Sequence, residues 1–397
     1  MKTLIRKALE NTDRPGMLSR ENERAIGLAN IVVVGSGGAG NNTIHRLKNL
    51  GITGAQLIAV NTDKQHLAHI NADKRILVGN EITRGLGAGG DPEIGEQAAL
   101  EAKPGFKEIF SEADLVFVTG GLGGGTGTGT LPVIAEVAKS CGALVIGAVT
   151  MPFKNERARV NKARIALTKL RSSADSVVVI DNNKLLEIAS DLPVNEAFAV
   201  ADEVLSRMVK GITETISIAS LMNLDFADVR TVMGRNNGDG IAVIGLGESD
   251  TSNRAEESVT YAMENPLLDV DYRDATGALI HITGGEDLTL GEATGIVDLA
   301  TTFLTKNADV IWGARIDPEY NGKVQVMVIM TGVTSPDLAA NMSEPEIHIQ
   351  QRVKVGNRTY FSRQSGGGRF KSSGQRLVAN NGKGSLMSEL GIDEVFS

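Results

Sequence analysis

Runs of strand-forming residues that lead directly into glycine-rich loops dominate the first third of this sequence. Residues 30–34 read NIVVV and precede the loop 35–42, which contains G-x-G-x-x-G and is followed by a helical pattern. Residues 115–119 lead in the same way into the loop 120–130. Glycine lets the backbone approach a phosphate closely, and the N-terminus of the following helix supplies N–H donors. The pattern therefore predicts a phosphate-binding site at the carboxyl ends of strands.

Taken alone, the first loop is as typical of a dinucleotide-dependent oxidoreductase as of any other phosphate-binding protein. In such an oxidoreductase, Asp63 would be the acid about 20 residues further on. A third glycine loop at 85–91 and the threonines of the second loop favour a nucleoside triphosphate, because three such loops would converge at one sheet edge. Any single loop is also explained by structural glycine turns. No G-x-x-x-x-G-K-[ST] occurs, which excludes a P-loop NTPase. The helix behind the second loop is expected to start at Pro132, since proline is favoured in a first helical turn.

Apolar runs alternate with helix-length stretches through the first half of the chain, which predicts a parallel sheet. A helical pattern over 195–220 follows, and strand patterns with fewer helices lie beyond it. We therefore expect an α/β fold: a doubly wound parallel-sheet nucleotide-binding domain joined by a long central helix to a smaller α+β domain. The expected divisions are an N-terminal extension (1–29), the nucleotide-binding domain (30–195), the central helix (196–222), the α+β domain (223–335), a basic flexible linker (336–385) and a C-terminal peptide (386–397).

Composition excludes several classes of protein. Of the 397 residues, 42% are hydrophobic, enough for buried cores. The single cysteine, Cys141, excludes a disulfide framework and a cysteine-based metal site, and the five scattered histidines show no two-histidine metal spacing. No apolar run approaches the ~20 residues of a membrane span, and residues 1–13 contain no signal-peptide core. We expect a cytoplasmic protein whose own side chains hold no metal.

The sequence GGGTGTG at 123–129 resembles the signature of the tubulin/FtsZ GTPase superfamily. Further segments in the order and spacing of FtsZ are 35–42, 61–63, 87–91 and 223–229. Details at 155–159 and 268–272 are most similar to archaeal FtsZ, in particular the second of its two paralogues. The resemblance covers about residues 30–335 and implies the tubulin/FtsZ fold, GTP and GDP as nucleotides, Mg²⁺ as the cofactor and a polymerising GTPase of the cell-division ring.

The resemblance also implies which residues bind the nucleotide. Asn182, Phe198 and Asp202 match positions that hold guanine, where a carboxylate accepts from N1–H and the exocyclic amine. Without the resemblance, Asp202 could equally be a solvated helix acid and Phe198 a core residue. Glu156 and Arg159 would lie near the ribose and phosphates, although one residue fewer separates them than in bacterial members, so Arg157 remains an alternative. The remaining expected GTP-binding residues are Gly37, Gly38, Ala39, Gly40, Asn41, Asn61, Asp63, Gly87, Ala88, Gly89, Gly90, Gly123, Gly124, Gly125, Thr126, Gly127 and Thr128.

Asp225 and Asp228 lie far along the chain from the glycine loops. Their spacing of three places both carboxylates on one side of a helical turn, where they could cap a helix or orient a water. The resemblance implies that Asn223, Asp225 and Asp228 form the catalytic loop that one subunit inserts into the nucleotide site of the next. A head-to-tail contact of this kind generates an open filament. A GTP-binding filament scaffold with little hydrolysis is the alternative.

The C-terminal region has a different character. Residues 352–383 contain eight Lys and Arg and no acid, together with many small polar residues, which predicts a flexible tether. Residues 386–396 return to apolar and acidic side chains and resemble the peptide by which FtsZ proteins bind partners. The resemblance implies self-association, an FtsZ paralogue and a SepF-like membrane anchor as partners at the mid-cell ring. Direct nucleic-acid binding is not expected.

Overall fold

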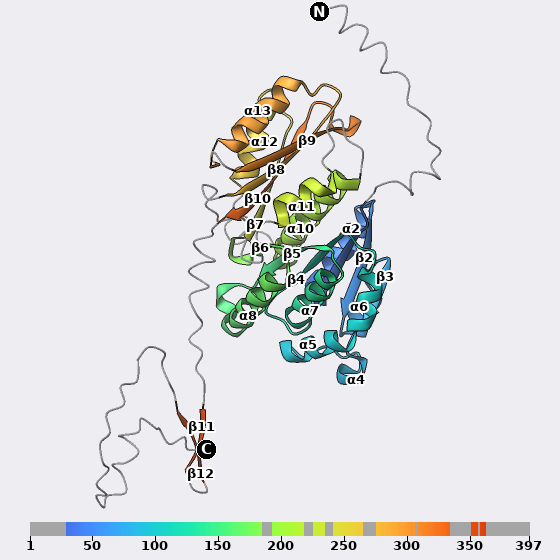
Figure 1. Cartoon of the computed structure of the whole chain (residues 1–397), viewed down its shortest axis with the longest axis vertical. Coiled ribbons are helices and arrows are strands. Elements are labelled where there is room, and N and C mark those ends of the chain that lie inside the picture. The colour runs from blue at the N-terminus through green and yellow to red at the C-terminus, as the bar shows by residue number, and fades with distance from the viewer. Residues whose placement is uncertain are drawn as a thin grey trace, which may run out of the picture. The chain divides into compact units, whose positions relative to one another are not determined.

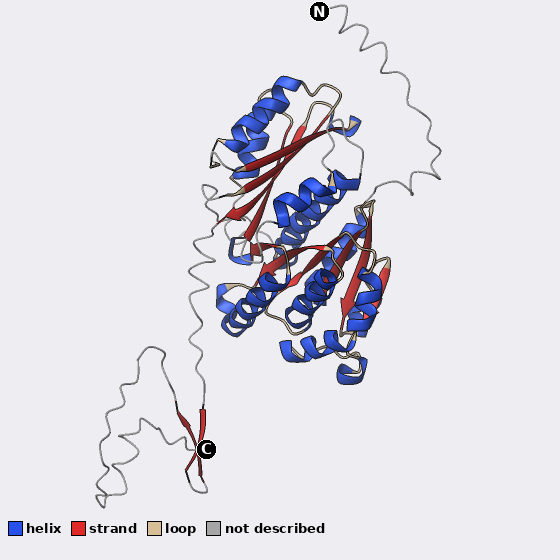
Figure 2. Cartoon of the chain, viewed as in Figure 1, coloured by secondary structure: helices blue, strands red, loops and turns tan. Residues whose placement is uncertain are grey.

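The computed structural model describes the residue ranges 29–184, 193–217, 225–234, 241–264, 275–302, 304–305, 308–333, 351–355 and 358–362. They belong to two compact units that divide between Leu338 and Ala339. The first unit contains a ten-stranded sheet flanked by helices, and the second contains a two-stranded sheet (Figures 1 and 2). The predicted α/β class is confirmed.

Six parallel strands build the first part of the large sheet, in the order β3-β2-β1-β4-β5-β6. Their bounds are β1 (Ile31–Ser36), β2 (Ala55–Asn61), β3 (Lys74–Leu77), β4 (Leu115–Gly121), β5 (Leu144–Met151) and β6 (Ser176–Asp181). Helices cover both faces, so the central strands are buried throughout, which explains their continuous apolar sequences. The strand order reverses between β1 and β4, and such a reversal opens a crevice at the carboxyl ends of the two strands.

The helices that cover this sheet divide between its two faces. One core contains apolar residues of α2 (Gly37–Asn49), α3 (Lys64–Ala68), α10 (Val194–Ser217) and α11 (Phe226–Gly234). The other core contains residues of α5 (Pro92–Glu101), α6 (Lys103–Phe110), α7 (Thr126–Ser140) and α8 (Arg157–Ser173). A short helix, α4 (Asn80–Thr83), precedes α5. The helices after β1 and after β4 therefore lie on opposite faces.

The start of α7 differs from the expectation. The helix begins at Thr126, and Pro132 lies inside it. Hydroxyl groups stabilise the glycine-rich first turn: Gly123 N donates to Thr128 Oγ1 at 2.9 Å, and Thr130 Oγ1 donates to the Thr126 carbonyl at 2.8 Å. Glycine and threonine are weak helix formers, so local propensity gives no sign of this start.

The long predicted helix is confirmed as α10, within the part of the chain that the structure describes. Leu205, Met208 and Ile212 are buried in the core that it shares with the parallel strands. Gly211 lies so close to β10 (Val324–Val333) that a Cβ atom there would meet Met327 Sδ at 2.7 Å. The helix thus packs against both parts of the large sheet.

Four further strands continue the sheet in the order β7-β10-β8-β9. The other bounds are β7 (Ile241–Ser249), β8 (Gly277–Gly284) and β9 (Asp309–Ile316). β10 is antiparallel to β7 and β8, whereas β8 and β9 are parallel. The helices α12 (Arg254–Met263) and α13 (Leu290–Thr301) lie side by side on this part (Figure 1). A short parallel pairing of β6 with β7 joins the two parts.

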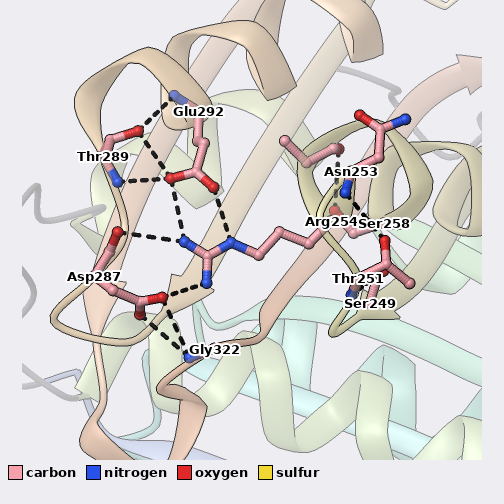
Figure 3. A network of polar contacts seen from close by, with 10 residues as sticks. Ser249, Thr251, Asn253, Arg254, Ser258, Asp287, Thr289, Glu292 and Gly322 are labelled. Carbon is pink, nitrogen blue, oxygen red and sulfur yellow. Dashed lines mark hydrogen bonds and ion pairs between the residues drawn. The ribbon is translucent and has the colours of Figure 1, made fainter.

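One arginine holds together three segments at the edge of this second part (Figure 3). Arg254, at the start of α12, donates from Nη1 to Asp287 at 2.5 Å and from Nε to Glu292 at 2.8 Å. Asp287 also accepts from the Gly322 N–H, and Glu292 forms a capping box with Thr289 at the start of α13. The Arg254 guanidinium lowers the pKa of Glu292 to about 2. These contacts join the start of α12 to the connection before α13 and to the connection between β9 and β10.

The second unit contains a hairpin of β11 (Gln351–Val355) and β12 (Arg358–Ser362). It falls within the range expected to be a flexible linker. Its first strand alternates Arg352 and Lys354 with valines, its second contains Tyr360 and Phe361, and the intervening Gly-Asn pair is typical of a two-residue hairpin turn. Among the described residues of the whole chain, no helix is both long and apolar enough to span a membrane.

Candidate nucleotide site

A cleft of about 790 Å³ lies at the carboxyl ends of the parallel strands. Eleven of the expected nucleotide-binding residues line it: Gly37, Gly38, Ala39, Gly124, Gly125, Thr126, Gly127, Glu156, Arg159, Asn182 and Asp202. They come from the connections after β1, β4, β5 and β6 and from α10. The structure thus brings together segments that are up to 165 residues apart in the sequence.

Two helix N-termini meet at this cleft. α2 begins at Gly37 and α7 at Thr126, and neither has a side-chain hydrogen bond capping its first turn. Uncapped first-turn N–H groups together with the helix dipole form an anion site. Gly37 has φ +72°, and a Cβ atom there would meet the Gly127 N at 2.8 Å. Only glycine fits where the two loops approach each other.

Side chains behind the loops fix their shape. Ser36 Oγ and Thr130 Oγ1 are 2.5 Å apart, and Thr62 Oγ1 and Thr126 Oγ1 are 2.7 Å apart. Asn41 is fully buried, and with its amide oriented to suit its neighbours it donates to the Gly35 and Val60 carbonyls. These contacts tie the ends of β1 and β2 to the start of α7, which follows β4.

Ten expected residues do not line the cleft. They are Gly40, Asn41, Asn61, Asp63, Gly87, Ala88, Gly89, Gly90, Gly123 and Thr128. Asp63 instead caps α3, where its carboxylate accepts from Gln65 N and His66 N. The loop 85–91 packs behind the second glycine loop, because a Cβ atom at Gly125 would meet Asp91 N at 2.8 Å and Ala88 Cβ at 2.9 Å. Asp63 thus caps a helix, and Ala88 and Asp91 pack against Gly125 of the second glycine loop, which lines the cleft.

The side of the cleft expected to hold the base contains polar groups with unmet hydrogen-bonding capacity. Asn182 is 8% exposed, and its Oδ1 has no hydrogen-bond partner among the described residues. Burial raises the pKa of Asp202 to about 6, although Arg46 and the Thr43 hydroxyl act in the opposite direction. Asn182 Oδ1 and the Asp202 carboxylate are both hydrogen-bond acceptors, which suits the N–H donors of guanine. Phe198 lies on α10, but its side chain is outside the described residues.

Glu156 and Arg159 lie together at the start of α8. Arg159 Nη1 is 2.7 Å from Glu156 Oε2, and Glu156 Oε1 accepts from Phe153 N at 3.1 Å. Arg159 lines the cleft whereas Arg157 does not, which favours Arg159 as the residue facing a nucleotide. Among the described residues, Arg159 is the one arginine or lysine that lines the cleft. Backbone N–H groups must therefore supply much of the phosphate binding.

Seven further residues line the cleft: Asn42, Gly121, Leu122, Thr150, Pro152, Phe153 and Asn155. The first three lie within the predicted loops 35–42 and 120–130, and the other four were not identified from the sequence. Most of them follow the ends of β4 and β5. Their position after strands that border the crevice is the signal that could have found them. Among the described residues, no group of three His, Cys, Asp or Glu side chains could hold a metal ion.

Asp225 and Asp228 do not reach this cleft. Asp228 N donates to Asp225 Oδ1 at 2.9 Å and Asp225 N donates to Asp228 Oδ2 at 3.1 Å, so the two residues cap the start of α11. α11 lies near the amino ends of the parallel strands, whereas the cleft lies at their carboxyl ends. Arg230 of α11 donates to the Gly142 carbonyl, just before β5 begins. Asn223 lies outside the described residues.

Comparison with known proteins agrees with this architecture. Residues 30–190 match the Tubulin/FtsZ family, GTPase domain, and residues 240–334 match the FtsZ family, C-terminal domain. The chain is 56% identical to "Cell division protein FtsZ 2" of Methanocaldococcus jannaschii, over 86% of this chain and 89% of the relative. It is 49% identical to "Cell division protein FtsZ 2" of Haloferax volcanii, over 100% of this chain and 98% of the relative. The solved structure "FtsZ dimer, empty" from M. jannaschii superposes with a TM-score of 0.73 at 51% identity, covering 79% of this chain and 93% of that one.

The fold and the cleft together define a tubulin-like GTPase, for which GTP and GDP are the nucleotides. The chain belongs to the FtsZ family of cell-division proteins. Membership implies a filament-forming role in cell division, and the expected family and activity are confirmed.

Proposed function

We propose that this protein hydrolyses GTP at a site shared between two adjacent subunits of a head-to-tail filament. GTP would occupy the cleft of one subunit, and Asp225 and Asp228 of the next would complete the site. The observation that carries this proposal is the separation of the two groups within one chain. β5 has eight residues, and a strand rises about 3.3 Å per residue, so the amino and carboxyl ends of the parallel strands are about 25 Å apart. Stacking of identical chains brings one end against the other.

Each part of the chain has a stated role in this reaction. The first-turn N–H groups of α2 and α7 bind phosphate oxygens, Arg159 adds a positive charge, and Asn182 and Asp202 hold guanine. Asp225 and Asp228 orient the attacking water. Their mutual capping leaves one oxygen of each carboxylate for this task. Mg²⁺, when bound, neutralises charge that develops on the phosphates.

The proposed partners follow from the family. The protein would assemble with copies of itself and with an FtsZ paralogue at the mid-cell division ring. Residues 386–397, which are outside the described residues, would bind a SepF-like membrane anchor. The mixture of apolar and acidic side chains in this peptide supports a docking role.

Two variants with different nucleotide preferences test the shared site. Asp228→Asn leaves the cleft intact and keeps an oxygen that can cap Asp225 N, so it should bind GTP but lose nearly all turnover. Asp202→Asn should prefer XTP, because an amide accepts from N1–H and donates to the 2-oxo group of xanthine. In a mixture supplied with both nucleotides, GTP sits on Asp228→Asn subunits, and Asp202→Asn subunits supply the aspartates. We expect GTP hydrolysis, measured as phosphate release from γ-labelled GTP, to return in the mixture.

Each variant alone is the control. Asp202→Asn should hydrolyse XTP but little GTP, which checks the base assignment separately. Copolymers that form without regaining GTP turnover would contradict a shared site. Wild-type polymer that binds GTP but releases no phosphate would instead favour the filament scaffold with little hydrolysis.

A further inference from the structure

Two adjacent polar contacts connect α2, which starts at the phosphate side of the cleft, with α10, which carries Asp202. The Thr43 side chain lies close enough to the Asp202 carboxyl group to lower its pKa, while its hydroxyl donates to the Ala39 carbonyl at 3.2 Å. One turn further along α2, Arg46 Nη1 lies 2.6 Å from Glu203 Oε2. Residues three apart on a helix project from the same side, so the two contacts lie next to each other between the helices.

Of the two arginines that contact Glu203, Arg46 is the one that lowers the pKa of Asp202. Asp202 lines the cleft, whereas Arg46 is not among the described residues that line it. Glu203 also accepts from Arg207 Nε at 2.6 Å, so its charge is shared between two arginines. Glu203 therefore does not fully neutralise Arg46, whose charge also favours the ionised form of the Asp202 carboxyl group. Arg46 acts in this way although it does not line the cleft.

The charged groups around Asp202 are few in the described part of the chain. From α2 the facing groups are the Arg46 guanidinium and the neutral Thr43 hydroxyl. On α10 itself, Glu203 and Arg207 follow. Burial favours the protonated form of Asp202, and Arg46 contributes most among the groups that favour the ionised form. A protonated carboxyl group has one acceptor fewer for the two N–H donors of guanine.

We propose that Arg46 is a specificity-determining positioning residue: it holds the Asp202 segment of α10 against α2 and keeps the Asp202 carboxylate charged, so that guanine is selected at neutral pH. This inference rests on the proposed role of Asp202 in binding the base. It assigns a function in nucleotide choice to a side chain that does not face the cleft.

The test compares Arg46→Gln, Arg46→Lys and the matched control Arg207→Gln, which breaks the other ion pair of Glu203. GDP affinity of the full chain is measured from about pH 5.5 to about pH 8.5, at concentrations that give no sedimentable polymer. For Arg46→Gln we expect the fall in affinity on acidification to begin at higher pH, with a roughly tenfold loss near pH 6.5 and little loss near pH 8.5. Arg46→Lys should restore the wild-type profile, and Arg207→Gln should keep it.

Three outcomes would overturn the inference: an unchanged profile in Arg46→Gln, an equal loss at every pH, or the same displacement in Arg207→Gln. An equal loss at every pH would show a purely structural role. The proposed function is tested separately by Asp202→Asn. If that variant binds GDP like the wild type at all pH values, the base assignment is wrong. If it loses GDP while Arg46→Gln keeps the wild-type profile, only the role of Arg46 is wrong.

Discussion

Asp202 shows how a single carboxyl group can be positioned for binding at a cost in stability. Its pKa rises from 3.8 to about 6 because the folded protein buries it. The folded state therefore favours the protonated acid, and this stabilisation is complete below about pH 3.8 and is lost as the pH rises through about 6. At neutral pH the carboxylate is charged, which is the state that guanine binding requires under our proposal.

Asp202→Asn should therefore stabilise the nucleotide-free protein at neutral pH while it weakens GDP binding. A shift of about two pKa units corresponds to at most about 3 kcal/mol in the free energy of unfolding. We expect a gain of that order at about pH 7.5 and almost none near pH 3, measured by urea denaturation of the nucleotide-free chain. A gain of equal size at both pH values would show that the ionised carboxylate is not its cause.

At the scale of elements, the glycine signature has two separate functions. Gly124 to Gly127 face the cleft, but Gly129 does not. A Cβ atom at Gly129 would meet the Pro92 carbonyl oxygen at 2.2 Å and Glu96 N at 2.4 Å. Gly129 therefore lets α7 and α5 pack with their backbones in contact, which also places the loop 85–91 against the glycine loop that lines the cleft.

Gly129→Ala should destabilise the protein, because the backbones of α5 and α7 must separate. Overpacking of this kind costs about 1–3 kcal/mol in the free energy of unfolding, which denaturant titration measures. Gly105→Ala in α6 is the matched control, since a Cβ atom there meets nothing within 4 Å. That change should stabilise the helix by up to about 1 kcal/mol. A neutral Gly129→Ala variant would show that the two helices tolerate greater separation.

The sequence predicts much of the element-scale structure because the relevant signals are local. Parallel strands buried on both faces require continuous apolar residues, so β1, β4, β5 and β6 are visible in the sequence. The predicted start of α7 at Pro132 was wrong, because Thr126 and Gly127 are weak helix formers and gave no sign of the earlier start. The contact of Arg46 with Glu203 could not be predicted, since it depends on which segments meet after the sheet is assembled. Likewise, the capping contacts of Asp225 and Asp228 are local, but their distance from the cleft is a property of the whole fold.

At the scale of the whole molecule, the cleft and the capped aspartates lie at opposite ends of the parallel strands of one sheet. Neither end is complete as a hydrolytic site under our proposal, so activity should depend on assembly. The sheet separates the two groups rigidly, because its central strands are buried on both faces. Bending of a single chain therefore offers no route that brings Asp228 to its own nucleotide.

GTP turnover per protein molecule across a dilution series, with Mg²⁺ present, tests this central claim most directly. We predict almost no turnover below a threshold concentration and a rise above it that parallels the appearance of sedimentable polymer. Dilution of active polymer below the threshold should abolish turnover, since GTP binding alone does not complete the site. A rate per molecule that stays constant through the dilution series would contradict the account, because each monomer would then contain its whole hydrolytic site.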